Sequence, residues 1–159
     1  MAFDKAKKYL DNCGVGDRVQ EFDVSSATVE LAAAAVGVEG ARIAKTLSFT
    51  VSGEPILIVA AGDAKVDNRK YKDKFAVKAK MLTPEEAVEL VGHAVGGVCP
   101  FGVNEGVKTY LDESLKRFQT VYPACGSSNS AVELNLEELF KFSKAIEWID
   151  VCKLPEASL

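Results

Sequence analysis

The pattern of hydrophobic and polar residues changes along this chain every few residues, between patterns typical of β-strands and patterns typical of α-helices. Two apolar, β-rich runs at 44–51 and 55–61 flank the turn sequence Ser52-Gly53-Glu54, a pattern that predicts a β-hairpin. Further strands are predicted at 18–23, 107–111, 119–122, 131–134 and 146–151. Short strands therefore make up a large part of the expected structure.

Helical periodicity fills most of the segments between these strands. Helices are predicted at 3–12, 28–36, 67–75 and 135–142, and another begins at Thr83. Thr83-Pro84-Glu85-Glu86 combines a capping Thr, Pro at the first helical position and Glu three residues after the cap. Asn135 and Glu138 repeat the capping pair, and Gly37 stands where helices favour a left-handed residue.

The order of these elements favours an α+β fold. Strands joined directly in some places and by short helices in others fit a mixed, partly barrel-like β-sheet surrounded by helices. A length of 159 residues predicts a single domain, 1–159. Regular β-α-β alternation is missing, and neither G-x-G-x-x-G nor a P-loop follows the first strand, which disfavours a dinucleotide enzyme or an NTPase.

Composition indicates where the protein is expected to be located and whether it is expected to bind a membrane or a metal. A hydrophobic content of 48% and a charged content of 26% are ordinary for a soluble domain, and no run approaches the roughly 20 apolar residues of a membrane span. The first residues lack the apolar core of a signal peptide, so a cytoplasmic protein without a membrane partner is expected. Four scattered cysteines and a single histidine give no metal-ligand spacing, and neither a metal nor a cofactor is expected.

A glycine-rich stretch at 92–102 combines four glycines with Pro100 and apolar residues. We interpret it as a strand end that runs into a rigid, partly buried turn whose amides point into a cavity. A purely structural bulge and turn is the alternative. A second bend of small residues at 122–130 also leads into a predicted strand.

Lys45 lies inside an apolar strand. Period-2 alternation places it on the same face as Ile43 and Leu47, which is unusual for a lysine that faces solvent. An edge lysine whose ammonium reaches water is the alternative interpretation.

Four segments together resemble the YbaK/ProX family, free-standing relatives of the editing domain inserted in bacterial prolyl-tRNA synthetases. They are the lysine motif at 42–47, the run at 56–63, the glycine loop at 96–102 and the turn-strand at 126–134. The resemblance spans roughly residues 17–148. It implies a compact mixed α/β fold and a hydrolase that removes the wrong amino acid from tRNA.

The resemblance also implies the site residues and the partners. Lys45 would be the catalytic residue, and the expected substrate-binding residues are Thr46, Gly96, Gly97, Val98, Gly102, Gly126 and Ser127. The partners would be the acceptor end of a mischarged tRNA and an aminoacyl-tRNA synthetase, but not DNA. Small polar residues at 124–129 suggest a small substrate such as Ala, Ser or Cys.

Two alternatives to this mechanism and function stay open. An aminoacyl ester is already activated, so water can be the nucleophile, yet Cys99 and His93 could instead form a thiol–imidazole pair. The second alternative is a non-catalytic module that binds an aminoacyl end, an amino acid or a nucleotide.

The distribution of charge bears on tRNA binding. The net charge is −4, but seven basic and two acidic residues between 65 and 80 give that segment +5, which leaves −9 for the rest of the chain. A basic segment in an acidic protein would confine phosphate contacts to one face. The expected tRNA contacts are Lys65, Arg69, Lys70, Lys72 and Lys74; a solvated helix flank is the alternative.

Overall fold

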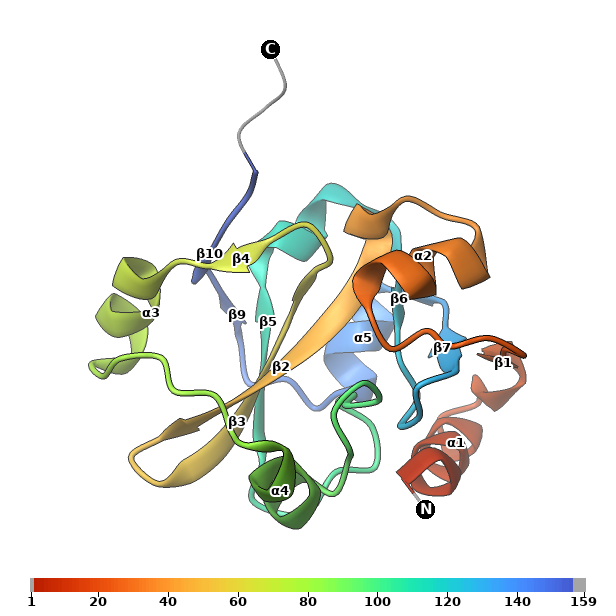
Figure 1. Cartoon of the computed structure of the whole chain (residues 1–159), viewed down its shortest axis with the longest axis horizontal. Coiled ribbons are helices and arrows are strands. Elements are labelled where there is room, and N and C mark those ends of the chain that lie inside the picture. Colours follow the sequence, from red (N-terminus) through yellow and green to blue (C-terminus); the bar gives the residue numbers. More distant parts are fainter. Residues whose placement is uncertain (1, 156–159) are drawn as a thin grey trace.

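The computed structural model describes residues 2–155 and is built on a curled, mixed β-sheet (Figure 1). Its six strands lie in the order β8-β6-β2-β3-β5-β9. Their bounds are β2 Ile43–Val51, β3 Glu54–Ala61, β5 Lys108–Asp112, β6 Thr120–Pro123, β8 Leu134–Asn135 and β9 Trp148–Ile149. Helices surround this sheet, which confirms the α+β fold with a mixed, partly barrel-like sheet.

The hairpin of β2 and β3 forms the centre of the sheet. The strands pair antiparallel from Ala44 opposite Ala61 to Val51 opposite Glu54, and Ser52 and Gly53 both have positive φ angles, 52° and 84°. The outer neighbours β6 and β5 pair parallel with β2 and β3, respectively. The predicted hairpin is confirmed.

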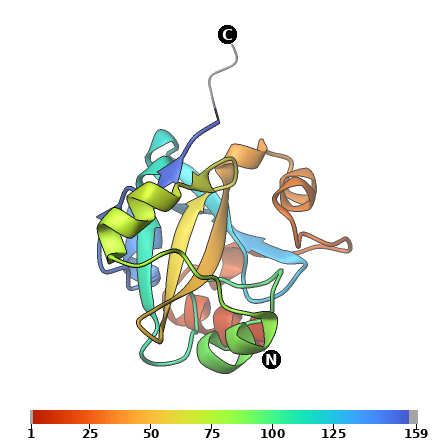
Figure 2. The same ribbon diagram turned by 60° about the vertical axis from the view of Figure 1, so that its left-hand side comes forward.

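The described part of the chain, 2–155, has five α-helices around the sheet: α1 Ala2–Asn12, α2 Val29–Val36, α3 Asn68–Phe75, α4 Pro84–Glu86 and α5 Leu136–Phe142. In Figure 1, α5 lies behind the sheet and α3 to its left, and the rotated view of Figure 2 brings α3 to the front. The capping boxes of Thr83 with Glu86 and of Asn135 with Glu138 are both formed. Gly37 ends α2 in the left-handed conformation, as predicted.

The prediction of a strand end within the glycine-rich stretch at 92–102 was wrong, because residues 92–102 form turns and bends and no strand. A π-helical turn, Ala87–Val91, continues α4 and ends at Gly92, whose φ of 95° makes it a helix C-cap. A helix stop and a strand end leave a similar pattern when glycine follows apolar residues, because both need a residue without a side-chain restraint on φ.

The strands predicted at 131–134 and 146–151 are not continuous in the structure. The expected strand at 131–134 is divided between β7 (Ser130–Val132), which pairs with β1 (Val19–Glu21), and β8, which pairs with β6. Beyond β9, the N–H of Val151 donates to a carboxylate oxygen of Asp112 instead of continuing the ladder. The chain then forms β10 (Cys152–Lys153) against β4 (Lys65–Val66).

The core lies on both faces of β3, whose residues 56–61 are all buried. Phe49 of β2 and Tyr71 of α3 pack with ring centroids 5.2 Å apart on one side of the hairpin. Leu10 of α1 and Leu139 of α5 are completely buried in the same cluster. Within residues 2–155, the helices are too short or too polar to span a membrane.

Candidate active site

A cavity of about 240 Å³ opens beside β2. Its walls come from β2, from the segment that leads into α2, and from the two small-residue bends of the sequence. The polar side chains of the wall include those of Ser26, Thr28, Lys45, Thr46, Ser48, Tyr122 and Ser130. Apolar side chains that range from alanine to leucine and methionine make up most of the rest. A largely apolar hollow with a few convergent polar groups is the usual form of a small-molecule site.

Three loops meet at this cavity through their backbones. The N–H of Ser26 donates to the carbonyl of Ser128 at 2.6 Å, and that of Phe22 donates to the carbonyl of Asn129 at 2.8 Å. Gly96, with φ of 95°, lies between Ala27 and Ser128. The hydrogen bonds hold the segment at 22–26 against the bend at 128–129, and Gly96 places the loop at 94–98 beside both.

Lys45 is half-buried on β2, and its ammonium is held by backbone. Its Nζ donates to the carbonyl oxygens of Gly62, at 3.3 Å, and of Ala64, in the turn that follows β3. This arrangement differs from that of a freely solvated edge lysine. Lys45 is a residue of the cavity wall, and the two carbonyls fix the position of its positive charge.

The surroundings also alter the acidity of this ammonium. Burial lowers the pKa of Lys45 below its usual 10.5, because desolvation disfavours the charged form, while the nearby Asp63 carboxylate acts in the opposite direction. A lysine that is charged, partly desolvated and fixed interacts more strongly with a developing negative charge than a solvated one does.

Two hydroxyls in the cavity wall lack a protein partner. Among the described residues, Thr46 Oγ1 and Ser26 Oγ are buried and make no hydrogen bond. Buried polar groups are normally paired, so each such group calls for an explanation. Both residues line the cavity, where a bound ligand could supply the missing partner.

The other sequence-predicted substrate residues divide into two groups. Gly96 and Val98 line the cavity, and Gly97 lies directly behind them against Ser127. Ser127 itself is hydrogen-bonded to the hydroxyl of the lining Ser130 at 2.6 Å.

Gly102 and Gly126 do not reach the cavity wall. A β-carbon at Gly102 would stand 2.9 Å from the carbonyl oxygen of Lys5, and one at Gly126 would stand 2.6 Å from that of Ala2. Both glycines also have positive φ angles, 65° and 84°. Their small size allows the loops to pack against α1, which is a structural reason for glycine at both positions.

Cys99 and His93 do not form a thiol–imidazole pair. The Nδ1 atom of His93 accepts the backbone N–H of Cys99 at 3.1 Å, while the thiol contacts the carbonyl oxygen of Phe101 at 3.6 Å. Burial raises the pKa of the Cys99 thiol to about 12 and lowers the pKa of the His93 imidazole. A thiol that stays protonated is a poor nucleophile, so the geometry disfavours a cysteine hydrolase.

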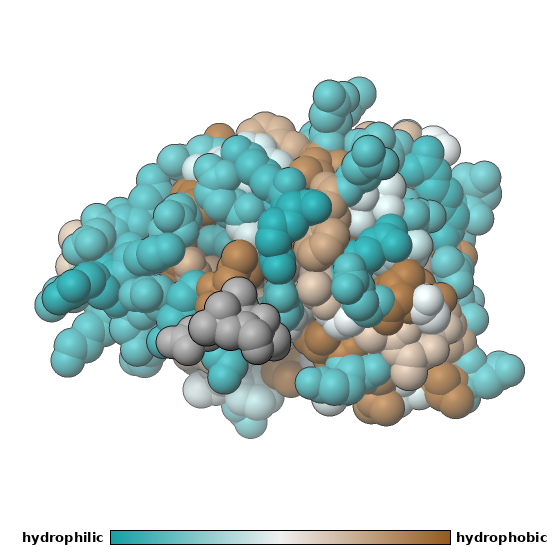
Figure 3. Space-filling view, turned by 90° about the horizontal axis from the view of Figure 1, so that it is seen from above, coloured by the Kyte–Doolittle hydropathy of each residue, from teal (hydrophilic) through white to brown (hydrophobic). Residues whose placement is uncertain are grey.

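The basic segment lies on β4, α3 and the chain after α3, on the largely hydrophilic left side of Figure 3. Lys70 and Lys74 pair with Asp150 and Glu147, each at 3.0 Å. Within residues 2–155, no ion pair engages the remaining basic residues of the segment. Three of them, Arg69, Lys72 and Lys78, line a shallow hollow of about 440 Å³. Lys65 is exposed and directly follows Ala64, whose carbonyl holds Lys45.

Sequence reasoning missed several residues of the site. Ser26 and Met81 line the cavity but lie outside the motifs of the sequence, and only folding brings them to β2. Arg42, inside the lysine motif, lies over the Tyr122 ring at 5.2 Å and donates to Thr120 Oγ1 at 2.6 Å. It therefore fixes β2 to β6, a role that sequence spacing does not indicate.

Comparison with known proteins agrees with this architecture. Residues 23–142 match the family described as the aminoacyl-tRNA editing domain. The chain is 60% identical over 136 residues to YwhH of Bacillus subtilis (strain 168), itself described as uncharacterized, with 85% of this chain and 87% of YwhH covered. It is also 32% identical over 90 residues to the proline–tRNA ligase of Lysinibacillus sphaericus (strain C3-41), covering 56% of this chain and 16% of the ligase.

Solved structures extend the match to nearly the whole chain. A crystal structure of a proposed trans-editing enzyme for prolyl tRNA synthetase superposes with a TM-score of 0.86 at 31% identity, covering 96% of this chain and 97% of the other. The hypothetical protein APE2540 superposes with a TM-score of 0.83 at 27% identity, covering 94% and 99%. The chain belongs to the aminoacyl-tRNA editing domain family, which confirms the resemblance drawn from its motifs.

Proposed function

We propose that the protein is a trans-editing hydrolase that cleaves the aminoacyl ester bond of mischarged tRNA and releases the amino acid. The single observation that carries the proposal is that Lys45 lines a cavity while two backbone carbonyls fix its ammonium. Similarity to proline–tRNA ligases and to a proposed trans-editing enzyme favours tRNA mischarged by prolyl-tRNA synthetase as the substrate.

Hydrolysis of the ester requires a polarised carbonyl, a positioned water molecule and donors for the developing oxyanion. In this proposal Lys45 supplies positive charge to the carbonyl or to the terminal ribose. Over the described part of the chain, the N–H groups of Gly96 and Val98 donate to no protein acceptor, whereas that of Gly97 donates to the carbonyl of Ala94 at 3.0 Å. We assign the stabilisation of the oxyanion to the two free N–H groups.

Water is the proposed nucleophile. The ester is already activated, so covalent catalysis is not needed, and the buried Cys99 thiol supports this choice. A hydroxyl of the substrate's own terminal ribose would take part in activating the water, since among residues 2–155 no carboxylate or histidine lines the cavity to serve as the base.

The cavity favours a small aminoacyl side chain. Its walls include the five alanines Ala27, Ala32, Ala44, Ala124 and Ala131. The unpaired hydroxyls of Ser26 and Thr46 could accept hydrogen bonds from the substrate's amino group or bind a polar side chain. Alanine, serine and cysteine are therefore the proposed products.

The experiment is a deacylation assay with the full chain and a proline tRNA charged with alanine, serine, cysteine or phenylalanine. We expect release of one or more of the three small amino acids, retention of phenylalanine, and loss of activity in Lys45→Ala. Lys141→Ala, which removes an exposed lysine of α5, is the matched control and should keep the parent rate. Binding without release would favour the non-catalytic module, and a fully active Lys45→Ala would exclude the assigned role of Lys45.

A further inference from the structure

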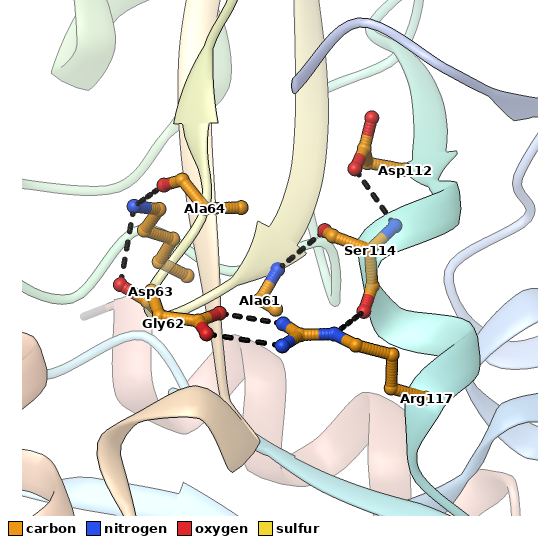
Figure 4. A network of polar contacts seen from close by, with 8 residues as sticks. Ala61, Gly62, Asp63, Ala64, Asp112, Ser114 and Arg117 are labelled. Atoms are coloured by element: carbon orange, nitrogen blue, oxygen red, sulfur yellow. Dashed lines mark hydrogen bonds and ion pairs between the residues drawn. The ribbon is translucent and has the colours of Figure 1, made fainter. Parts of the chain in front are cut away.

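The turn that holds the Lys45 ammonium is itself held from its opposite side. The N–H of Ala64 donates to the carbonyl of Ala61 at 3.0 Å and closes the turn. The carbonyls of Gly62 and Ala64 accept from Lys45, whereas the Asp63 carboxylate between them faces the Arg117 guanidinium (Figure 4). Three consecutive residues thus connect the lysine to an arginine that lies outside the cavity wall.

Arg117 binds this turn through a two-point contact with the Asp63 carboxylate. Its Nη1 and Nη2 atoms donate to the two carboxylate oxygens of Asp63 at 3.0 and 2.5 Å, and its Nε donates to the carbonyl of Ser114 at 3.0 Å. These bonds hold the pKa of Asp63 below its usual value, so the carboxylate stays charged at neutral pH. A planar guanidinium bound at three atoms fixes direction as well as distance.

The support behind Arg117 is buried. The hydroxyl of Ser114 accepts the N–H of Ala61 at 3.1 Å, and the N–H of Ser114 donates to Asp112 at 2.9 Å. The other carboxylate oxygen of Asp112 accepts the N–H of Val151 at 3.0 Å. Asp112 and Ser114 are only 1% and 7% exposed. Their hydrogen bonds join the ends of β3 and β5 and the chain after β9 into one rigid support for Arg117.

The turn is also confined on its far side. A β-carbon at Gly62 would collide with the carbonyl oxygen of Gly40, so backbone packs directly on backbone there. The carbonyls of Gly62 and Ala64 consequently have little room to change direction while the contact between Asp63 and Arg117 persists.

Building on the proposed hydrolysis, we infer that Arg117 and Asp63 are positioning residues that keep the Lys45 ammonium aimed at the reacting ester. Neither residue lines the cavity, so neither is placed to touch the bound aminoacyl group. Their contribution passes through the turn: without the two-point contact, the carbonyls relax and the ammonium turns toward solvent. Preorganised charge acts in the transition state, so its loss lowers kcat more than it changes KM.

The first test compares Arg117→Met and Arg117→Lys with Arg18→Met. The control removes another arginine–carboxylate contact, the 2.9 Å pair of Arg18 with Glu138, which lies at α5 rather than at the turn. We expect Arg117→Met to lower kcat about tenfold to hundredfold with KM within about twofold. The kcat of Arg117→Lys should fall between those of Arg117→Met and the parent. The lysine ammonium keeps the positive charge but cannot make the two-point contact of a planar guanidinium. Arg18→Met should match the parent.

A second readout does not depend on catalysis. Brief acetylation followed by peptide mass spectrometry measures the labelling of Lys45 relative to the exposed Lys141. Release of the ammonium from its two carbonyls should raise this ratio several-fold in Arg117→Met and leave it unchanged in Arg18→Met. If the parent protein deacylates nothing, the proposed function fails, while this ratio still tests the positioning of Lys45.

Parental kcat together with a parental labelling ratio in folded Arg117→Met would overturn the inference. Circular dichroism and thermal unfolding establish that each variant is folded. If Arg117→Met does not fold, Asp63→Asn replaces it, because the amide keeps the shape of the side chain but loses the charge and one acceptor oxygen. The same lower kcat and higher labelling ratio are then required of Asp63→Asn.

Discussion

The backbone of Gly97 lies against the backbone of Ser127 so closely that a β-carbon at position 97 would stand 2.7 Å from three Ser127 atoms. Contacts of that length do not occur between real side chains and backbone, so one of the two loops would have to move. The loops meet beside the cavity wall, which gives position 97 an effect on the site although its own atoms lie behind the wall.

Gly97→Val is therefore expected to separate the two loops and to reduce deacylation strongly. Overpacking of this kind costs about 1–3 kcal/mol of stability, and thermal unfolding measures that part of the effect. Gly106→Asn is the matched control, because that glycine has open space around it and asparagine tolerates its positive φ. Parental activity in Gly97→Val would mean that the loop contact has no role in the site.

The pH dependence of the reaction should follow Lys45. Burial lowers its pKa below 10.5, so the charged form, which the mechanism uses, is lost as the pH rises through that lowered value. The enzymatic rate, corrected for spontaneous ester hydrolysis, should decline over this alkaline range. Lys45→Arg should lose the decline while keeping a lower rate, since arginine stays protonated. An unchanged profile in Lys45→Arg would assign the titration to another group.

The same pKa shift predicts an effect on stability. A lysine whose pKa is lower in the folded than in the unfolded chain destabilises the fold where it is charged, and this cost disappears only at pH values above 10.5. Lys45→Met should therefore not lower the free energy of unfolding at pH 7, which urea denaturation measures. A large loss of stability in this variant would point to a structural role for the ammonium.

Cys99 is expected to be dispensable for the reaction. Its thiol is fully buried with a pKa of about 12, so Cys99→Ser should keep most of the activity, with the new hydroxyl donating to the Phe101 carbonyl. Iodoacetamide should modify the half-buried Cys13 before Cys99, which peptide mass spectrometry can follow. Complete loss of activity in a folded Cys99→Ser would instead support the alternative mechanism, in which Cys99 is the nucleophile.

The basic segment should contribute unequally to tRNA binding. Arg69, Lys72 and Lys78 line a hollow and form no ion pair within residues 2–155, whereas Lys70 and Lys74 are paired with carboxylates. Neutralising the first three to Gln should raise KM and remove roughly 0.7–0.9 from the salt slope for each lost phosphate contact. The double variant of Lys70 and Lys74 should change the slope less. Equal slopes in the parent and the triple variant would show that the acceptor end binds elsewhere.

The sequence predicted what depends on local chemistry. The capping boxes at Thr83 and Asn135, the Ser52-Gly53 turn and the Gly37 C-cap are encoded within a few residues, and all are present. The pairing of β7 with β1 and the hydrogen bonds that support Arg117 join segments that are distant along the chain. Their residues are ordinary serines, aspartates and arginines, whose roles depend on partners that no local pattern specifies.

The glycines of a single motif also show how far a local sequence pattern can predict a residue's role. Gly96, Gly97 and Gly102 all belong to the segment that resembles the editing family. Gly96 lines the cavity, Gly97 lies behind its wall against Ser127, and Gly102 packs against α1. A sequence pattern indicates that a side chain is not tolerated at a position. It does not distinguish a close approach to a ligand from a close approach to another helix.

The contact between the loops at 22–26 and 127–129 has a consequence for synthesis on the ribosome. Ser25 and Ser128, whose hydroxyl and carbonyl meet there, are 103 residues apart in the chain. The β2–β3 hairpin, with Lys45, can pair soon after it emerges, because its strands are adjacent. The cavity cannot close until the segment around Ser128 has also left the exit tunnel. A nascent chain therefore carries its lysine without a finished pocket, so the proposed hydrolysis cannot begin before these two loops have met.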